Sequence, residues 1–528
     1  MIDNEKKDTG MRLLEKSKHG IFKMIFSRSG LILLLLGVQI FFLFSIFYWF
    51  EGFLPHIYGG VIAFTVFMVL YILNCPMDPT SKVTWLIVVM LMPVFGALLF
   101  LYTQINVGHR ALQKRYAQIN DETKNSLHQS IEVINQLKEE NPEALALSRY
   151  VNRSGCYPIY DKTDVKYFPL GEDKFKEMLI QLKNARKFIF LEYFIIDEGK
   201  MWGEILEILS NKAKEGVDVR LLYDGTCELS RLPHNYPDKI RSLGIKCKMF
   251  APIKPFVSTH YNYRDHRKIL VIDGRVAFNG GVNLADEYIN IGSKFGHWKD
   301  TAVMISGEAV QSFTRMFLHM WSLDEKEKLE EFDEFINTPI DSLPSARGFV
   351  MPYGDCPLDD YRVGEQVYID MLNRAKNYIH IMTPYLIIDG EMENAIKFAA
   401  ERGVDVRIIL PGIPDKYIPF SLAYTHYRAL LKAGVKIYEY TPGFVHAKVF
   451  VSDDNEAIVG TINLDYRSLY HHFECATYMN GTNCISDIAE DFISTQEKCR
   501  EITYDMLKVQ PLKRRILGFI GKSIAPLL

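Results

Sequence analysis

The sequence predicts an α/β protein made of two homologous α/β sandwich halves, which are related by pseudo-two-fold symmetry and follow an N-terminal region of transmembrane helices. Three observations lead to this prediction. A pattern of His, Lys, Asp, Gly and Asn residues begins at His266 and again at His446. A helix, glycine and strand pattern repeats in register with it, and uncharged apolar segments lie near the start of the 528-residue chain.

The N-terminal region, residues 30–103, contains three apolar segments and follows a basic segment at residues 1–29. Residues 30–50 and 83–103 each run for 21 positions without a charged residue, which is long enough for a helix to cross a hydrocarbon layer. We expect both to be transmembrane helices. Residues 58–74 are also uncharged but have only 17 positions, so a third span and a buried helix both remain open.

Basic residues flank this region on both sides. Residues 1–29 hold seven Lys and Arg residues, and Arg110, Lys114 and Arg115 follow the last apolar segment. The positive-inside rule then places both the N-terminus and the catalytic portion in the cytoplasm, which three spans cannot satisfy. Either one apolar segment is re-entrant or interfacial, or one flank departs from the rule, so the number of spans and the orientation stay open. We expect a multi-pass membrane protein whose catalytic portion faces the cytoplasm.

Residues 104–150 are rich in Asn, Gln, Glu and Lys and predict a polar, helical and solvent-exposed linker. Within it, the stretch QSIEVINQLKEEN at 129–141 has apolar positions at helical spacing, which is typical of a packed amphipathic helix. Because such a pattern is common in helices that simply pack on a core, we assign no function to this region.

The two halves are predicted at residues 151–345 and 346–510. KAKEGVDVRLL at 212–222 matches AAERGVDVRII at 399–409, and ARKFIFLEYFIID matches AKNYIHIMTPYLIID further along. In each half, these patterns predict a helix, a buried strand, an amphipathic helix that ends at a glycine, and a further strand. The two glycines, Gly216 and Gly403, suit the position just after a helix, where the backbone turns left-handed.

Each half also carries the pattern HxKxxxxDxxxxxxG(G/T)xN. The segments HRKILVIDG and HAKVFVSDD predict strands, so each histidine and the lysine two positions later would share one face of a strand. The aspartate would lie at the strand end on the opposite face, as a structural member of the motif. The motif residues are His266, Lys268, Asp273, Gly280, Gly281 and Asn283 in the first half and His446, Lys448, Asp453, Gly460, Thr461 and Asn463 in the second.

These residue types suit the chemistry of a phosphodiester. A phosphodiester carries a negative charge and a poor alkoxide leaving group, so it needs cations or donors at its free oxygens and an acid at the leaving oxygen. Lys268, Lys448 and the two asparagines can supply the first. Histidine, with an unperturbed pKa of roughly 6.5, can attack as neutral imidazole or donate a proton as imidazolium. Two histidines that share one phosphate would titrate as a coupled pair.

The duplicated motif and the blocks around it resemble the phospholipase D superfamily and, more narrowly, the bacterial cardiolipin synthase family. The blocks are NYRDHRK and GHWKDTAVMISGEAV in the first half and TPYLIIDGEM, ERGVDVRIILPG, NLDYRS and HHFE in the second. The resemblance extends over about the whole chain. It implies phospholipase D-like halves in a bacterial cell membrane, with His266, Lys268, Asp273, His446, Lys448 and Asp453 as the candidate catalytic residues.

The resemblance also implies how the site works. One histidine forms a phosphatidyl-histidine intermediate, without a metal or other cofactor. His266 is our choice for the nucleophile and His446 for the general acid and then base, although the reverse order stays open. An acidic residue downstream of each motif would orient each histidine, a role that Glu474 and Asp300 fit. The chain departs from the family pattern in having Thr461 for Ser and His472 for Asn; Thr keeps the hydroxyl, and His472 affects only the detail of head-group contacts.

Composition and charge restrict the kinds of partner and cofactor that the sequence predicts. The net charge is −3 and no basic run with interleaved aromatic residues occurs, so nothing predicts a nucleic-acid partner. The eight cysteines form no CxxC pair, which favours reduced thiols over a zinc site or a disulfide framework. Aromatic residues crowd the first motif (Phe256, His260, Tyr261, Tyr263 and Trp298) and suit either a lipid interface or the core.

The sequence therefore favours a membrane-bound cardiolipin synthase, which reversibly converts two phosphatidylglycerols into cardiolipin and glycerol. Phosphatidylglycerol and cardiolipin in the bilayer would be its partners. A membrane-bound phospholipase D would use the same residues with water as acceptor. A catalytically silent scaffold that binds anionic lipid is the second alternative, although both motifs are intact, and a nuclease is a weaker third.

The C-terminal segment, residues 511–528, is amphipathic. A Lys-Arg-Arg cluster is followed by apolar residues at helical spacing. Such a helix could rest on an anionic lipid surface or pack on the catalytic domain, and both possibilities remain open. The apolar positions are Leu512, Ile516, Phe519, Ile520 and Ile524.

Overall fold

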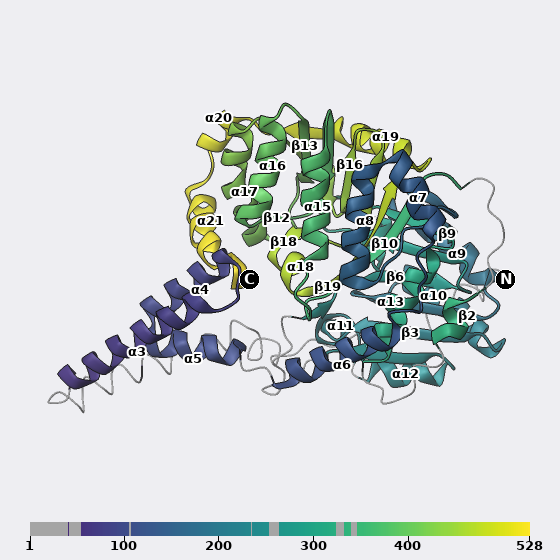
Figure 1. The fold of residues 1–528 in the computed structure, drawn as a ribbon, viewed down its shortest axis with the longest axis horizontal. Helices are drawn as coiled ribbons and strands as arrows, with labels where there is room; N and C mark the ends of the chain where they lie inside the picture. The colour runs from purple at the N-terminus through teal and green to yellow at the C-terminus, as the bar shows by residue number, and fades with distance from the viewer. Residues whose placement is uncertain are drawn as a thin grey trace, which may run out of the picture.

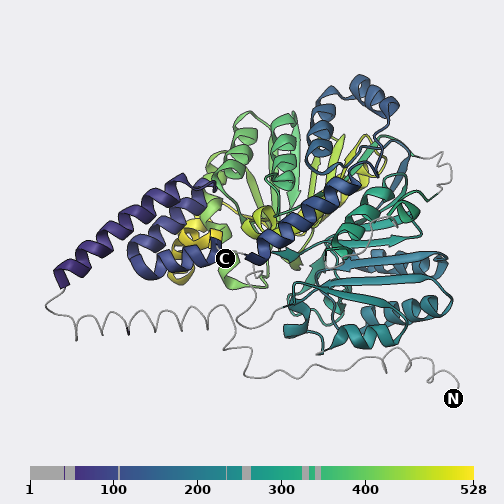
Figure 2. The same cartoon turned by 60° about the horizontal axis from the view of Figure 1, so that its bottom comes forward.

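The computed structural model describes residues 41, 54–104, 107–233, 235–252, 263–323, 332–338 and 346–527. Within them the chain forms two α/β halves, each built around one large sheet, and a group of N-terminal helices that extends from the body (Figure 1). The two halves lie side by side, the first in teal and the second in green to yellow (Figure 2). The predicted α/β class with two repeated halves is confirmed.

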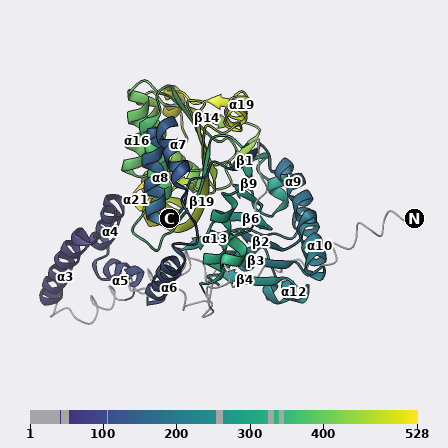
Figure 3. The same cartoon turned by 45° about the vertical axis from the view of Figure 1, so that its right-hand side comes forward.

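The N-terminal helices are α3 (Leu54–Asn74), α4 (Pro79–Leu91) and α5 (Pro93–Gln104). The segment predicted at 58–74 lies within α3, whereas the segment at 30–50 falls outside the described residues apart from position 41. Among the described helices, none is both long enough and apolar enough to span a membrane. Figures 1 and 3 show these helices on the side of the molecule where the C-terminal helix lies.

The prediction of one continuous helix over 83–103 is wrong, because two helices, α4 and α5, occupy this segment. Met92 ends α4 with non-helical backbone angles (φ −137°, ψ 74°), and Pro93 opens α5. A proline disfavours helical geometry in the residue before it and is well suited to the first position of a new helix. Trp85 and Phe100 then pack edge to face, with 5.2 Å between ring centroids, and hold α4 against α5.

The segment expected to be a solvent-exposed linker is helical but packed. It forms α6 (Val107–Thr123), α7 (Ile131–Glu140) and α8 (Pro142–Gly155). The side chains of Ile119, Leu137 and Val151 are fully buried and belong to the main hydrophobic core. The amphipathic pattern predicted at 129–141 accounts for α7, and the polar residues that dominate the composition lie on the outer faces.

The first half runs from β1 to α14. Its elements are β1 (Thr163–Phe168), α9 (Gly171–Asn184), β2 (Phe188–Tyr193), α10 (Lys200–Lys214), β3 (Asp218–Asp224), α11 (Thr226–Ser230), α12 (Tyr236–Ser242), β4 (Lys246–Phe250), β5 (Arg264–Asp265), β6 (Lys268–Ile272), β7 (Val276–Gly280), η3 (Asp286–Ile289), β8 (His297–Lys299), β9 (Ala302–Gly307), α13 (Val310–Trp321) and α14 (Phe332–Ile336). The sheet order is β1-β9-β7-β6-β2-β3-β4.

The second half repeats this arrangement. Its elements are β10 (Phe349–Asp355), α15 (Val363–Arg374), β11 (Tyr378–Met382), β12 (Leu386–Ile387), α16 (Gly390–Glu401), β13 (Asp405–Pro411), α17 (Tyr417–Lys432), β14 (Lys436–Tyr440), β15 (Gly443–Val445), β16 (Val449–Ser452), β17 (Glu456–Gly460), β18 (Leu464–Asp465), α18 (Tyr466–Tyr470), β19 (His472–Asn480), α19 (Ile485–Gln496), β20 (Cys499–Glu501), α20 (Tyr504–Lys508), α21 (Leu512–Ile524) and η5 (Ala525–Leu527). Its sheet order is β10-β19-β17-β16-β11-β13-β14-β20.

The repeat is visible both in strand order and in local detail. The first seven strands of the second sheet follow the same order as the seven of the first. Gly216 and Gly403 follow α10 and α16 with φ of 92° and 94°, as predicted for glycine just beyond a helix. One hydrophobic core contains residues of both halves, including Phe190 and Phe317, whose stacked rings are 4.6 Å apart, and Phe473. The halves therefore form one folded body.

Candidate active site

The two motif histidines do not lie within strands, contrary to the prediction. His266 follows the short strand β5 and precedes β6, and His446 lies between β15 and β16. The strand is interrupted because the backbone bonds across to the other half. The His266 N–H donates to the Phe473 carbonyl (3.0 Å), and the His446 N–H donates to the Lys299 carbonyl (2.7 Å).

Two short parallel ladders create this crossing. β5 pairs with the start of β19, with Arg264 opposite His472, and β15 pairs with β8, with Gly443 opposite His297. Each ladder sets the strand that leads into one motif histidine beside the strand that leads into an acidic residue of the other half. The two motifs are thereby brought to one place, on the boundary between the halves.

The acidic residues that the resemblance assigned as orienting groups contact both histidines, but across the boundary. Nδ1 of His266 lies 2.8 Å and 3.0 Å from the two carboxylate oxygens of Glu474. Nδ1 of His446 lies 2.6 Å from Oδ2 of Asp300. A carboxylate at Nδ1 favours the tautomer that carries its proton there, which leaves Nε2 as the ring nitrogen for chemistry. Each half thus supplies one histidine and the partner of the other histidine.

The position after the motif's first glycine seats these carboxylates. In the second half it is Thr461, whose hydroxyl donates to Oε2 of Glu474. In the first half it is Gly281, where an added Cβ would lie 2.0 Å from Oδ1 of Asp300. The aspartate is shorter and lies against the backbone, so only glycine leaves room for it. This contact explains why the pattern reads G-G in one half and G-T in the other.

Both motif lysines are buried beside the histidines. Nζ of Lys268 and Nζ of Lys448 donate to the carbonyls of His266 and His446, respectively. Burial lowers the pKa of Lys268 to about 8 and that of Lys448 to about 7, because an ammonium group loses its hydration there. A bound anion would restore the stability of the charged forms.

The histidines are shifted in the same direction. Burial and then the charge of Lys268 hold the pKa of His266 well below its usual value. Burial and then the charge of Lys448 lower the pKa of His446 to about 4, and Asp300 opposes this shift. The two lysines and two histidines therefore lie together in a place where their cationic forms are stable only beside a negative charge. A phosphodiester anion would raise all four pKa values and allow one histidine to act as an acid.

Asp273 and Asp453 lie at turns, away from the histidines, with φ of 54° and 52°. The Asp273 carboxylate accepts three backbone N–H groups, and the Asp453 carboxylate accepts three at the equivalent place in the second half. Each carboxylate therefore fastens the turn of its motif to the chain that enters β2 or β11. The donors are Arg186, Lys187 and Phe188 in the first half and Lys376, Asn377 and Tyr378 in the second.

The two asparagines differ in their surroundings. Asn283 accepts the Ile195 N–H (3.0 Å) and donates to the Tyr288 hydroxyl (2.7 Å), so its amide is engaged within the protein. Oδ1 of Asn463 is buried and has no hydrogen-bond partner among the described residues. A phosphate contact by these residues stays a prediction, and the unpartnered atom of Asn463 is a hydrogen-bond acceptor.

A third histidine, His472, lies beside the first. Its ring centroid is 5.4 Å from that of His266, and its Nδ1 is 3.6 Å from a carboxylate oxygen of Glu474. Ligand atoms of His266, His472 and Glu474 all lie within 4.8 Å of one another, so they are a possible metal-binding group. A cation there would take the groups that orient His266 and would face two lysines, whose charges oppose it.

Aromatic rings wall the site. Tyr288 and Trp298 each have ring centroids 5.4 Å from that of His446, and Phe194 lies 4.8 Å from His266. Of the aromatic residues noted near the first motif, Trp298 contacts His446, and Tyr263 lies three residues before His266 in the chain. Phe256, His260 and Tyr261 fall outside the described residues.

Lys174 of α9 was not among the site residues predicted from the sequence. Its Nζ is buried and donates to the Val282 carbonyl (3.1 Å), and burial lowers its pKa to about 7. The charges of Asp300 and Lys268 also act on it. A signal was present, because Lys174 lies in the same helical stripe as the buried Met178 and Leu182. A lysine on an apolar stripe indicates a buried charge with a specific neighbour.

Comparison with known proteins adds to this geometry. The sequence matches the family described as "Cardiolipin synthase, PLD-like domain" over residues 178–321 and 368–495. Residues 63–102 match the family described as "Phospholipase_D-nuclease N-terminal".

Relatives match along most of their length. A cardiolipin synthase of Alkalihalophilus pseudofirmus is 35% identical over 85% of this chain and 89% of its own. One of Geobacillus kaustophilus is 32% identical over the same shares. An uncharacterized protein of Streptococcus mutans is 55% identical over 87% of this chain and 99% of its own. Among solved structures, a phosphatidylserine synthase of Haemophilus influenzae shares the fold, with a TM-score of 0.57 and 15% identity over 72% of this chain and 99% of its own.

Proposed function

Because the chain belongs to the cardiolipin synthase family of phospholipase D-like phosphatidyltransferases, we propose that it is a membrane-bound cardiolipin synthase acting on two molecules of phosphatidylglycerol. The observation that carries the proposal is the pair of crossed contacts, Glu474 with His266 and Asp300 with His446. Two histidines, each with its own carboxylate, supply a nucleophile and an acid within one buried cationic site.

In the first step, Nε2 of His266 attacks the phosphorus of one phosphatidylglycerol. The bond from phosphorus to the glycerol head group breaks as the phosphatidyl-histidine bond forms, and His446 gives its proton to the departing glycerol oxygen. Lys268 and Lys448 balance the charge on the free phosphate oxygens. Their lowered pKa values support this role, because a buried ammonium gains most from an arriving anion.

In the second step, a glycerol hydroxyl of another phosphatidylglycerol attacks the phosphatidyl-histidine. His446, now neutral, takes the hydroxyl proton as His266 leaves, and cardiolipin is formed. One phosphodiester replaces another, so the reaction needs no nucleotide and is reversible. Asp273 and Asp453 hold the motif turns in place, and the unpartnered carbonyl oxygen of Asn463 can accept a hydrogen bond from the incoming glycerol hydroxyl.

The domain limits form part of the proposal. Residues 1–29 and 30–103 make the basic segment and the membrane region, and residues 151–345 and 346–510 make the two catalytic halves. Residues 104–150 join the membrane region to the halves, and residues 511–528 form the C-terminal segment. The catalytic halves are placed in the cytoplasm because Arg110, Lys114 and Arg115 follow the last apolar segment.

The proposal is tested by incubating the purified protein in phosphatidylglycerol vesicles with EDTA and measuring the lipids by mass spectrometry. Cardiolipin and an equal amount of released glycerol are expected, at the same rate with and without EDTA. Phosphatidic acid in place of cardiolipin would show that water is the acceptor, as in a phospholipase D. Loss of activity in EDTA that zinc restores would overturn the metal-free mechanism.

A further inference from the structure

The C-terminal helix α21 packs on the protein through glycines. A Cβ added to Gly518 would lie 2.7 Å from the Ser421 carbonyl oxygen, and one added to Gly521 would lie 2.9 Å from the Leu422 side chain. Both contacts are with α17, so the glycine side of α21 is the side that faces the protein.

The outer side of α21 is apolar and exposed. The exposed fractions are 68% for Leu512, 49% for Ile516, 78% for Phe519 and 54% for Ile520. Such a ridge on one short helix is typical of a surface that contacts another apolar phase. Both possibilities that the sequence left open are therefore combined in one helix, which packs with its glycines and presents its apolar side chains outward.

The charges along the ridge have one sign. Lys513, Arg515 and Lys522 are exposed, and the segment LKRRILGFIGKSI contains no acidic residue. Arg514 faces the protein instead. Its guanidinium lies over the rings of Phe420 (4.9 Å) and Tyr424 (4.6 Å) and holds α21 against α17. An apolar ridge with basic flanks matches an anionic lipid surface, where acyl chains meet negatively charged head groups.

The surface continues onto the N-terminal helices. η5, which follows α21 directly, contacts α4, and Figures 1 and 3 show α21 beside α4. On α3 and α4, Phe67 is 63% exposed and Leu91 is 76% exposed. The helices beside α21 therefore also carry exposed apolar side chains.

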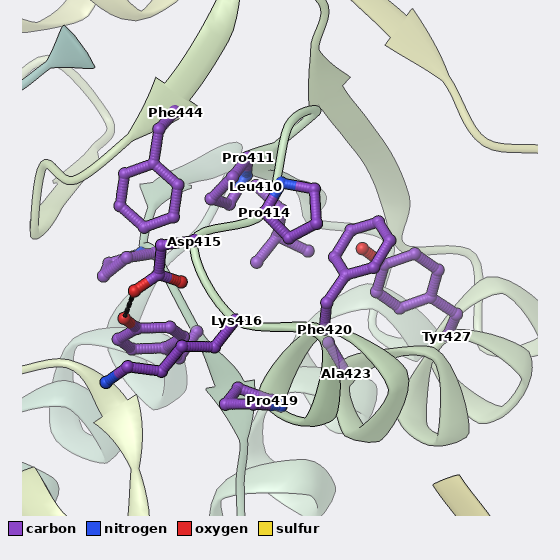
Figure 4. Close-up of a pocket in the computed structure, with 12 residues that line it drawn as sticks. Leu410, Pro411, Pro414, Asp415, Lys416, Pro419, Phe420, Ala423, Tyr427 and Phe444 are labelled. Atoms are coloured by element: carbon purple, nitrogen blue, oxygen red, sulfur yellow. Dashed lines mark hydrogen bonds between the residues drawn. The ribbon is translucent and has the colours of Figure 1, made fainter. Parts of the chain in front are cut away.

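A small pocket lies beside the contact between α17 and α21 (Figure 4). Phe420 of α17, which Arg514 covers, lines the pocket together with Pro414 and Tyr385, and Phe444 lines it from β15. Tyr385 donates to Asp415 within it (2.6 Å). The Phe444 ring centroid is 6.0 Å from that of His446. Phe444 thus belongs both to the lining of the pocket and to the aromatic wall around His446.

We propose that the outer face of α21 docks on an anionic lipid bilayer and holds the catalytic halves against it. The docking is independent of which reaction the site catalyses. Its consequence for turnover rests on the proposed function, and the test therefore has one readout for each.

The first readout needs no activity. Full-length protein carrying Phe519→Trp is reconstituted into vesicles of phosphatidylglycerol and phosphatidylcholine, and the quenching of its fluorescence by brominated acyl chains is measured. Ile131→Trp is the matched control, because Ile131 is 70% exposed on the distant helix α7. Quenching above the native tryptophan background is expected for position 519 and not for 131. Equal quenching at the two positions would overturn the docking surface.

The second readout uses Phe519→Asp, with Ile131→Asp as control. On phosphatidylglycerol vesicles, Phe519→Asp should lower the rate of cardiolipin formation about tenfold or more, whereas on monomeric short-chain phosphatidylglycerol its rate should equal that of the wild type. An equal loss on both substrates would show that Phe519 acts on the catalytic body and not through docking, and no loss on vesicles would show that α21 does not dock. Either result overturns the inference. If the wild type makes no cardiolipin, the quenching measurement still decides the docking.

Discussion

Replacing Asp300 by asparagine tests the crossed contact between the halves. Asp300 is fully buried, and its Oδ2 lies 2.6 Å from Nδ1 of His446. Asparagine has almost the same shape and can still accept the Thr301 N–H that Oδ1 now accepts (2.8 Å). The substitution therefore removes one negative charge with little change in packing, and the fold should be retained.

The expected loss follows from the strength of a charged hydrogen bond. Such a bond contributes about 1.5–3 kcal/mol, and each 1.4 kcal/mol is a factor of about ten, so the rate of cardiolipin formation should fall about 10-fold to 100-fold. The pH dependence should change as well. Asp300 raises the pKa of His446 against the effects of burial and Lys448, which together hold it at about 4. Without that charge the pKa falls further, so imidazolium is lost at a lower pH.

The assay is the initial rate of cardiolipin formation in phosphatidylglycerol vesicles between pH 5 and 9, with the thermal unfolding midpoint as the control for folding. In Asp300→Asn the decline of activity at high pH should begin at a lower pH than in the wild type, because His446 must be protonated to release glycerol. A rate within twofold of the wild type and an unchanged pH profile would refute the role of Asp300.

Three further predictions concern other parts of the site. His266→Ala and His446→Ala should each abolish cardiolipin formation while the protein stays folded in the membrane fraction; substantial activity in either would contradict the two-histidine mechanism. Gly281→Ala should lower activity at least tenfold, because its Cβ would lie 2.0 Å from the Asp300 carboxylate that contacts His446. Gly390→Ala is the control and should leave the activity unchanged, because nothing lies within 4 Å of that Cβ. Asp273→Ala should lower the free energy of unfolding by about 1–3 kcal/mol, since three backbone donors lose their acceptor; Asp273→Asn should lose less in the same denaturant titration, and equal losses would contradict the hydrogen-bonding role.

Much of the fold could be predicted from the sequence because the two halves repeat local patterns. Gly216 and Gly403 end equivalent helices, and their positive φ angles follow from the helix C-terminus alone. The break at Pro93 was also predictable, since proline restricts the residue before it, but the long apolar run outweighed that signal. The burial of α6–α8 was not predictable from a polar composition, because a few apolar positions such as Leu137 decide which face packs.

The candidate site, like the fold, could be predicted only in part. The residue types and spacings indicate which side chains matter, but they do not indicate which acid meets which histidine. Glu474 follows His446 in the chain and yet contacts His266, because two inter-half ladders, β5 with β19 and β15 with β8, set the register. Such ladders of two or three residues have no sequence signature of their own. The histidines leave their predicted strands for the same reason.

The most direct test of the two-histidine mechanism is to trap the phosphatidyl-enzyme. The protein is mixed with phosphatidylglycerol, quenched in base, digested and analysed by mass spectrometry, with His266→Ala and His446→Ala as parallel samples. The two-histidine mechanism predicts a base-stable, acid-labile bond from phosphorus to nitrogen on the peptide that contains His266, absent from His266→Ala, with the group detected as phosphatidyl or as the glycerophosphoryl group left after base removes the acyl chains. A wild-type enzyme that forms cardiolipin without a phosphatidyl group on either histidine, under conditions that detect one turnover, would contradict it.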